Sequence, residues 1–284
     1  MVDSKKQTAQ LGQLNKLQVK SILNMGAILN GLQLGDVLLP RRNMPDSLQE
    51  GSEIEVFVYL DSDDQPIATT ETPKVMVGQA AYLKVIDVNK TGAFMDWGLP
   101  KDLLLPYAEQ TNALRPGMFK VVYVYLDKAS KRITASARLD KHLLEENTWL
   151  KPGQEVDLLF CSKSDLGYKA VINNTHLGLL HHSDVFQNIM IGLHKKGYVK
   201  SINPDGKINL ILHIPNKEQL SELAENILAD LKANKGISYL TDKSSPDEIK
   251  ARWKVSKGSY KKAIGALYKQ RKILIEKDSI KLVE

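Results

Sequence analysis

Short runs of alternating apolar and polar residues cover most of the first 214 positions of this 284-residue chain. Around Leu83 and Val85 every second residue is apolar, which is the period of a β-strand with one buried face. Equivalent inward positions carry Leu17 and Val19 in an earlier segment, and Leu158 and Phe160 in a later one. Turn-forming Gly, Pro and Asp residues separate the runs, so the pattern predicts three β-rich units of similar length.

The three units share a register of glycines. Residues 92–106 read GAFMDWGLPKDLLLP, and segments of the same length begin with glycine at 26–40 and 167–181. A glycine also lies fourteen residues before each opening glycine and another eleven after each segment, at Gly12, Gly78 and Gly153 and at Gly51, Gly117 and Gly192. Glycine is required where the backbone needs a positive φ or a close approach, so this register indicates three copies of one structural unit.

Each copy is predicted to hold five short strands in about sixty residues, which is typical of a small closed antiparallel barrel. The remaining residues predict three helices. Residues 217–234 carry apolar side chains at helical spacing, Ser245 and Pro246 begin a second helix, and a third starts at Lys257. In the third helix we expect Tyr260, Ile264, Leu267 and Tyr268 to face the core.

A hairpin at 272–275 and 280–283 completes a winged-helix pattern. We expect domains at 1–74, 75–146, 147–214 and 215–284, with a short linker helix at 139–149. No apolar run approaches the length of a membrane span and the first residues lack the apolar region of a secretory signal, so we expect a cytoplasmic protein without membrane contact. Cys161 is the single cysteine, which excludes an intramolecular disulfide.

Positive charge is concentrated at the C-terminus. The chain has 39 Lys and Arg against 33 Asp and Glu, a net charge of +6. Residues 215–284 hold fifteen basic and ten acidic residues, so they carry +5 of this total. Between positions 250 and 272 there are nine Lys or Arg and no Asp or Glu. Such a face is expected to meet an acidic partner.

The order of these features resembles that of the S1 RNA-binding domain, a variety of OB fold. The shared elements are a strand, GAF followed two places later by an acidic residue, an L-L-x-P/H run, PGxxxxVxVxxxD and a closing strand. Three such domains before a basic winged helix resemble the CvfB (conserved virulence factor B) family of bacterial RNA-binding proteins. The resemblance covers nearly the whole chain and implies a mainly β fold: three tandem S1/OB-type five-stranded barrels followed by an α+β winged-helix domain.

The resemblance also implies where nucleic acid binds. The family site has one aromatic residue before the opening glycine, another two places after it, a histidine ending the third strand, and Asp and Arg around the last turn. In the second copy the matching residues are Phe94, Asp127 and Arg132, with Trp97 nearby; in the third copy the candidates are His181, Lys207 and Lys169. The first copy keeps only Asp61 and is expected to be a packing barrel.

Each candidate has a plainer interpretation. Phe94 and Trp97 could fill space between neighbouring barrels, and the recurring aromatic residues Phe57, Tyr123 and Tyr198 could pack under linkers rather than stack on bases. On the third C-terminal helix and just beyond it we expect phosphate contacts from Lys257, Lys261, Lys262, Lys269 and Arg271. The alternative there is a basic surface used for protein contacts.

These features favour a non-catalytic, post-transcriptional regulator that binds single-stranded RNA through barrels 2 and 3 and the winged helix. One alternative is a DNA-binding transcription regulator whose barrels serve packing or dimerisation; another is a ribonuclease. We find no catalytic constellation and expect no cofactor. A metal site is not expected from the histidines of the third copy, because adjacent strand residues such as His181 and His182 point to opposite faces.

Overall fold

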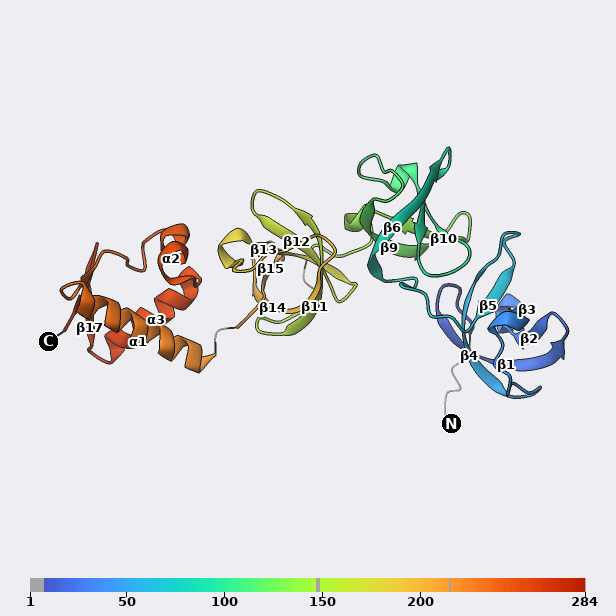
Figure 1. The fold of residues 1–284 in the computed structure, drawn as a ribbon, viewed down its shortest axis with the longest axis horizontal. Coiled ribbons are helices and arrows are strands. Elements are labelled where there is room, and N and C mark those ends of the chain that lie inside the picture. Colours follow the sequence, from blue (N-terminus) through green and yellow to red (C-terminus); the bar gives the residue numbers. More distant parts are fainter. Residues whose placement is uncertain (1–7, 147–148, 215, 284) are drawn as a thin grey trace. The chain divides into compact units, whose positions relative to one another are not determined.

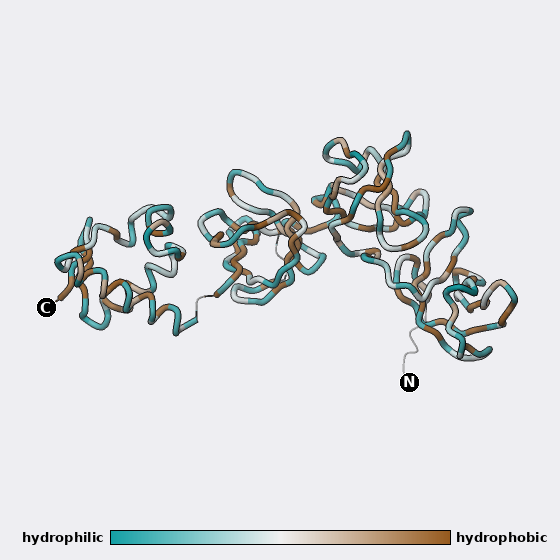
Figure 2. Tube along the Cα trace, in the orientation of Figure 1, coloured by the Kyte–Doolittle hydropathy of each residue, from teal (hydrophilic) through white to brown (hydrophobic). Residues whose placement is uncertain are grey.

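The structure, a computed structural model, describes residues 8–146, 149–214 and 216–283. The chain divides into two compact units, Met1–Leu143 and Leu144–Glu284. Figure 1 shows the ribbon of both units and labels many of their strands and helices. Figure 2 shows that apolar residues concentrate along strands and helices, whereas many of the connecting turns are hydrophilic.

The first unit holds two five-stranded barrels. Barrel 1 is closed in the order β1-β2-β3-β5-β4. Its strands are β1 (Leu14–Leu23), β2 (Gly26–Asn30), β3 (Asp36–Pro40), β4 (Glu53–Leu60) and β5 (Pro66–Thr69). Barrel 2 has the equivalent order β10-β9-β6-β7-β8. Its strands are β6 (Ala80–Asn89), β7 (Gly92–Asp96), β8 (Leu103–Pro106), β9 (Phe119–Leu126) and β10 (Ile133–Ser136).

The opening glycine of each copy begins the second strand, where that strand pairs with the end of the third. Gly92 pairs with Pro106, and a Cβ on Gly92 would lie 2.4 Å from the carbonyl oxygen of Leu105. The same atom on Gly26 or Gly167 would lie 2.0 or 2.1 Å from the equivalent carbonyl oxygen. No side chain fits at such a distance, so the close approach of two strands explains why glycine recurs here.

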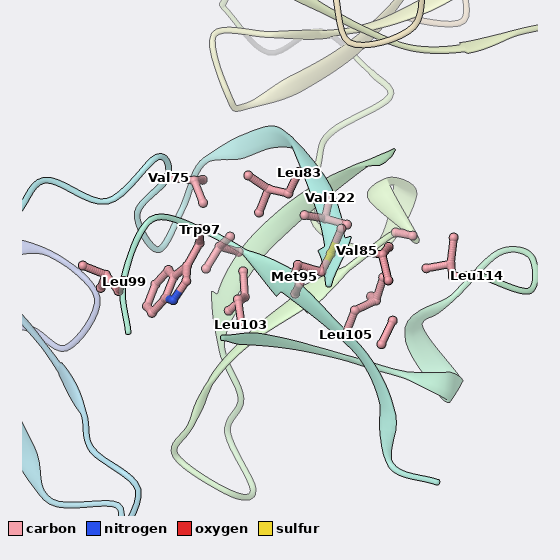
Figure 3. Close-up of a cluster of buried hydrophobic side chains, with 14 of the residues drawn as sticks. Val75, Leu83, Val85, Met95, Trp97, Leu99, Leu103, Leu105, Leu114 and Val122 are labelled. Atoms are coloured by element: carbon pink, nitrogen blue, oxygen red, sulfur yellow. The ribbon is translucent and has the colours of Figure 1, made fainter. Parts of the chain in front are cut away.

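The hydrophobic core of barrel 2 extends to two aromatic residues of barrel 1, which has a separate core of its own. Phe57 and Tyr59 of β4 pack against Trp97, with ring centroids 5.7 and 6.4 Å apart in edge contacts. Figure 3 shows Trp97 beside Leu99 within the cluster of buried side chains. The backbone N–H of Val77 also donates to the carbonyl oxygen of Gly12 at 2.9 Å. The two barrels of this unit are therefore packed against each other rather than merely tethered.

The second unit begins with barrel 3, which is closed in the order β11-β12-β13-β15-β14. Its strands are β11 (Glu155–Lys163), β12 (Gly167–Ile172), β13 (His176–His181), β14 (His194–Ile202) and β15 (Ile208–Ile211). Leu158, Phe160, Leu180 and Leu210 are fully buried in its core. The inward positions predicted from the alternating pattern are thus buried in all three barrels, as they are for Leu17 and Leu83.

The C-terminal domain follows in the same unit. It comprises α1 (Lys217–Ala233), β16 (Ile237–Ser238), α2 (Pro246–Trp253), α3 (Lys257–Lys269), β17 (Ile273–Ile275) and β18 (Ile280–Leu282). Ser245 and Glu248 form a capping box at the start of α2. Leu231, Ile249, Tyr260 and Ile264 are buried where the three helices meet. The predicted fold class is confirmed: a mainly β chain with three barrels and a winged helix.

Two local expectations are wrong. Within 139–146 only Leu139–Lys141 forms a helical turn, of 3-10 type. The backbone of Leu144 instead bonds to barrel 3: its N–H donates to the carbonyl oxygen of Thr175 at 3.0 Å, and its carbonyl oxygen accepts from the N–H of Leu177 at 2.8 Å. These two groups are therefore not available for the hydrogen bonds of a helix. Residues 147–148 of the expected linker helix lie outside the described residues. Tyr268 is 53% exposed, because Tyr260, Ile264 and Leu267 already form the buried stripe of α3.

No helix in the described part of the chain is long and apolar enough to cross a membrane. The finer division into domains at residues 74, 146 and 214 stays a prediction.

Candidate nucleic-acid interface

The predicted binding face of barrel 2 forms one side of a groove of about 480 Å³. Phe94 of β7 lines this groove and is half-buried, and Arg132 lies at the end of the β9–β10 turn beside it. Trp97 also lines the groove, but it is only 3% exposed and its Nε1 donates to the carbonyl oxygen of Lys101 at 2.6 Å. The ring of Trp97 belongs to the core cluster of barrel 2, where it packs against barrel 1 as the packing alternative predicts. The ring of Phe94 is the more accessible of the two.

Arg132, the predicted cation of the barrel 2 groove, forms an ion pair. The guanidinium of Arg132 pairs with the carboxylate of Asp64, which belongs to the β4–β5 turn of barrel 1. Lys101 lies on the other side of the same carboxylate, with its Nζ 3.6 Å from Oδ1 of Asp64. The hydrogen bond from Arg132 holds the pKa of Asp64 below its ordinary value. Arg132 and Lys101 nevertheless remain 57% and 39% exposed, so both are accessible to an anion.

Asp127 shapes the turn that carries Arg132. Its carboxylate accepts from the backbone N–H of Ser130 at 2.8 Å and from the Ser130 hydroxyl at 2.7 Å. These hydrogen bonds lower the pKa of Asp127. The backbone N–H of Asp127 donates to the carbonyl oxygen of Arg132 at 2.9 Å. The geometry assigns Asp127 to holding the turn, and it does not line the groove that Phe94 and Arg132 share.

Barrel 3 has its own groove, of about 320 Å³, and it brings together two of the predicted cations. Lys169 of β12 and Lys207 of the β14–β15 turn line it with the apolar side chains of Leu166 and Leu179. Lys169 pairs with Glu145 at 3.3 Å. Lys207 pairs with Asp205 at 3.1 Å, and the hydrogen bond between them raises the pKa of Lys207.

His181 ends β13 but does not line this groove. Its ring is half-buried, and its Nε2 lies 3.0 Å from the side-chain oxygen of Asn209 on β15. The structure therefore places His181 at the edge of the face, where its ring is held in a fixed orientation by a neighbouring strand.

The other histidines of barrel 3 have separate partners. His176 is buried and its Nδ1 lies 2.9 Å from the hydroxyl of Thr175, while Nε2 of His182 lies 3.0 Å from the carbonyl oxygen of Ser164. Among the residues that the structure describes, no group of three or more His, Cys, Asp or Glu is placed to hold a metal ion.

The third site region is the solvent face of α3. Its opposite face is buried in the winged-helix core, so the basic residues are directed outward. Lys261, Lys262, Lys269 and Arg271 are exposed and Lys257 is partly exposed. Lys261 lies 3.6 Å from the carboxylate of Asp242, and none of the other four forms an ion pair within the described residues. Apart from Lys261, the cations of this face have no neutralising partner among the described residues.

Several residues of these faces were missed in the sequence. Asp64 pairs with the predicted site residue Arg132, and Glu145 pairs with the predicted site residue Lys169. Lys101 contacts Asp64, which lies in a different barrel. No local pattern marks them, because the contacts exist only once two segments have packed. Tyr268 is different: it follows the buried Leu267 in a basic helix, and helical spacing could have placed it on the exposed face.

Two curated relatives align with most of the chain. The uncharacterized protein YitL of Bacillus subtilis is 26% identical over 254 residues, covering 84% of this chain and 83% of that protein. Conserved virulence factor B of Staphylococcus aureus is 27% identical over 291 residues, covering 96% of this chain and 94% of that protein. A solved structure of a multidomain protein with nucleic acid binding domains from Streptococcus pneumoniae covers 96% of this chain and 98% of its own, with 23% identity and a TM-score of 0.41.

Family models assign the segments. The S1 domain model matches residues 11–71 and 77–137, which are barrels 1 and 2. The model of the CvfB-like winged helix domain matches residues 225–282. S1 domains bind nucleic acid, so the groove beside Phe94 and Arg132 lies on a domain of a nucleic-acid-binding class. The chain thus contains two S1 domains and, after a third barrel, a CvfB-like winged helix domain.

Proposed function

We propose that this chain is a non-catalytic protein that binds single-stranded RNA and regulates transcripts after transcription, acting in the cytoplasm. The observation that carries the proposal is the combination of cations with apolar side chains in the grooves of barrels 2 and 3. Arg132 lies beside Phe94 in one groove, and Lys169 beside Leu179 in the other. A single strand offers unstacked bases to apolar surfaces and phosphates to cations, whereas a duplex hides its bases in the stack.

The basic face of α3 supplies the sequence-independent part of this proposal. Its unpaired lysines would contact phosphates and release counterions, which makes affinity fall steeply with salt. The name of the Staphylococcus relative, conserved virulence factor B, supports a regulatory role for this chain as well.

A second candidate, a DNA-binding transcription regulator, draws on the same α3 face. In helix-turn-helix relatives the corresponding helix enters the major groove of duplex DNA. In this candidate the barrels serve packing or dimerisation.

Competition binding separates the two candidates. The full chain is mixed with a fluorescein-labelled oligouridine, and anisotropy is followed as unlabelled competitor is added. We expect unlabelled single-stranded RNA to displace the label at far lower concentration than duplex DNA of the same length. Displacement by duplex DNA at equal or lower concentration would establish the transcription-regulator alternative instead. Loss of oligouridine in the presence of Mg²⁺ would contradict the non-catalytic assignment.

A further inference from the structure

The groove on barrel 2 has walls from two barrels. Tyr59 and Asp64 line it from β4 and the β4–β5 turn of barrel 1, opposite Phe94 and Arg132 of barrel 2. Barrel 1 lacks the aromatic and basic residues of the S1 site in its own sequence. It nevertheless forms one side of the groove in which the best-matched residues of barrel 2 lie.

The two walls are held in fixed register. The backbone N–H of Lys74 donates to the carbonyl oxygen of Trp97 at 2.8 Å, and the side-chain amide of Gln13 donates to the carbonyl oxygen of Val77 at 2.5 Å. Phe57 and Trp97 fill the interface below the groove. The shape of the groove is therefore fixed by the packing of barrel 1 against barrel 2.

A turn of barrel 1 delivers a carboxylate to the cations of barrel 2. The side chain of Asp61 accepts from the backbone N–H groups of Asp63 and Gln65, each at 2.9 Å, which shapes the β4–β5 turn. Asp64 adopts the left-handed conformation there, with φ of 60°. Asp61 is the one residue through which the first copy keeps the S1 pattern, and in this fold it shapes the turn that presents Asp64.

The carboxylate of Asp64 contacts two side chains of the kinds that bind phosphate groups. It lies between the guanidinium of Arg132 and the ammonium of Lys101, the two kinds of donor that bind phosphate oxygens. Both ion pairs are solvent-exposed, and exposed pairs change an equilibrium constant by about fivefold at most. A phosphodiester can therefore replace the carboxylate without a large energetic cost.

A comparable arrangement recurs in the second unit. Glu145, in the segment that precedes barrel 3, pairs with Lys169 in the groove of that barrel. The coulombic influence of Glu145 and Glu146 adds to that of Asp205 in raising the pKa of Lys207. In both units an acidic side chain from a preceding segment neutralises a cation of the predicted binding face.

We propose that barrels 1 and 2 form one composite site for single-stranded nucleic acid, in which Asp64 of barrel 1 holds Arg132 and Lys101 until a backbone phosphate displaces it. This inference builds on the proposed function and adds two things. Barrel 1 is part of the binding site, and the carboxylate of Asp64 lowers the affinity for nucleic acid because it competes with the phosphate. A base next to the bound phosphate would contact Phe94.

The test compares two substitutions that remove the same charge from the same turn. Asp64→Asn removes the negative charge that faces both cations and leaves the hydrogen bond from Lys101 to the carbonyl oxygen of Asp61 in place. Asp63→Asn removes an exposed carboxylate that forms no ion pair among the described residues. The full chain is titrated against fluorescein-labelled oligouridine at several salt concentrations. We expect Asp64→Asn to tighten binding about two- to fivefold. We also expect it to steepen the salt dependence, by a slope of about 0.7 for each released cation that meets a phosphate.

Asp63→Asn should change affinity much less, and Lys101→Ala in the Asp64→Asn background should cancel part of the gain. Equal effects of Asp64→Asn and Asp63→Asn would overturn the composite site, because general electrostatics would then explain both. Weaker binding by Asp64→Asn, with unchanged thermal unfolding, would also overturn it, since Asp64 would then support binding. A wild-type chain that does not bind oligouridine refutes the proposed function itself, and the composite site with it.

Discussion

At the scale of single residues, His142 shows how a linker side chain can become part of a barrel. Its ring stacks on Tyr123 with centroids 5.1 Å apart, and it lies tilted against Tyr125 with centroids 4.5 Å apart. Its Nε2 is buried without a hydrogen-bond partner in the described part of the chain. Packing under a linker, the plainer interpretation of the recurring aromatic residues, is thus confirmed for Tyr123.

This packing predicts a pH-dependent stability. Burial lowers the pKa of His142; Glu109 and Asp140 oppose the shift and Lys141 adds to it. The unfolded chain therefore takes up a proton first as pH falls below about 6.5, the ordinary pKa of histidine. The contribution of His142 to stability is fully present above that value and is lost as pH falls toward the lower folded pKa. We expect the urea midpoint of fragment 1–143 to drop over this range, and His142→Phe to reduce the drop.

A second titrating group acts at lower pH. Burial alone would raise the pKa of Glu109, but hydrogen bonds from Lys141 and Ser136 lower it overall. Glu109 therefore adds a loss of stability only as pH falls below about 4.3, the ordinary pKa of glutamate. Parallel pH profiles for the wild-type fragment and His142→Phe above that range would contradict the role given to His142.

The residues that could be predicted from the sequence are those fixed by local backbone geometry. Gly92 is required by the Leu105 carbonyl oxygen, and the same geometry repeats at Gly26 and Gly167, so the register is visible in the sequence. The partner of Arg132 could not be predicted in this way. Asp64 lies 68 positions earlier and reaches Arg132 only because barrels 1 and 2 pack together.

At the scale of elements, local sequence patterns again predict some features, and contacts between distant segments determine the others. The alternating pattern predicts the strands, and helical spacing with capping signals predicts α1, α2 and α3. The expected linker helix failed because the backbone of Leu144 pairs with Thr175 and Leu177 of barrel 3. Local preference was overridden there by hydrogen bonds between segments thirty or so positions apart, which a pattern of neighbouring residues does not contain.

The basic face of α3 yields a prediction at this scale. Lys262 is exposed and forms no ion pair within the described residues, so it is free to contact a phosphate. We expect Lys262→Ala to weaken binding of all single-stranded RNA sequences about equally, by about fivefold at moderate salt, and to reduce the salt slope by about 0.7. Anisotropy titrations with oligouridine and oligoadenosine at several salt concentrations measure both quantities.

The matched control is Lys232→Ala, which removes an exposed lysine of the same domain from α1 instead of α3. It should leave affinity and salt slope nearly unchanged. If both substitutions have the same effect, the domain attracts RNA only through its net charge, and α3 is not a specific contact surface. If neither has an effect, the winged helix serves another partner.

At the scale of the whole molecule, the chain consists of two compact units that can be separated and tested for binding. The number and kind of domains could be predicted, since three copies of one glycine register precede a helical segment. The boundary between the units could not, because it depends on which barrel the linker joins. Leu144 bonds to barrel 3, so the chain is best cut between Leu143 and Leu144.

Fragments 1–143 and 144–284 each contain candidate binding faces, and the chain between them raises the effective concentration of the second site once the first is bound. We expect each fragment to bind oligouridine weakly, and the full chain to bind a long oligouridine about 10²-fold or more tightly than either fragment. An oligouridine too short to reach both units should remove this advantage, which separates linkage from a simple increase in contacts. If the full chain matches its better fragment at every RNA length, one unit alone carries the binding.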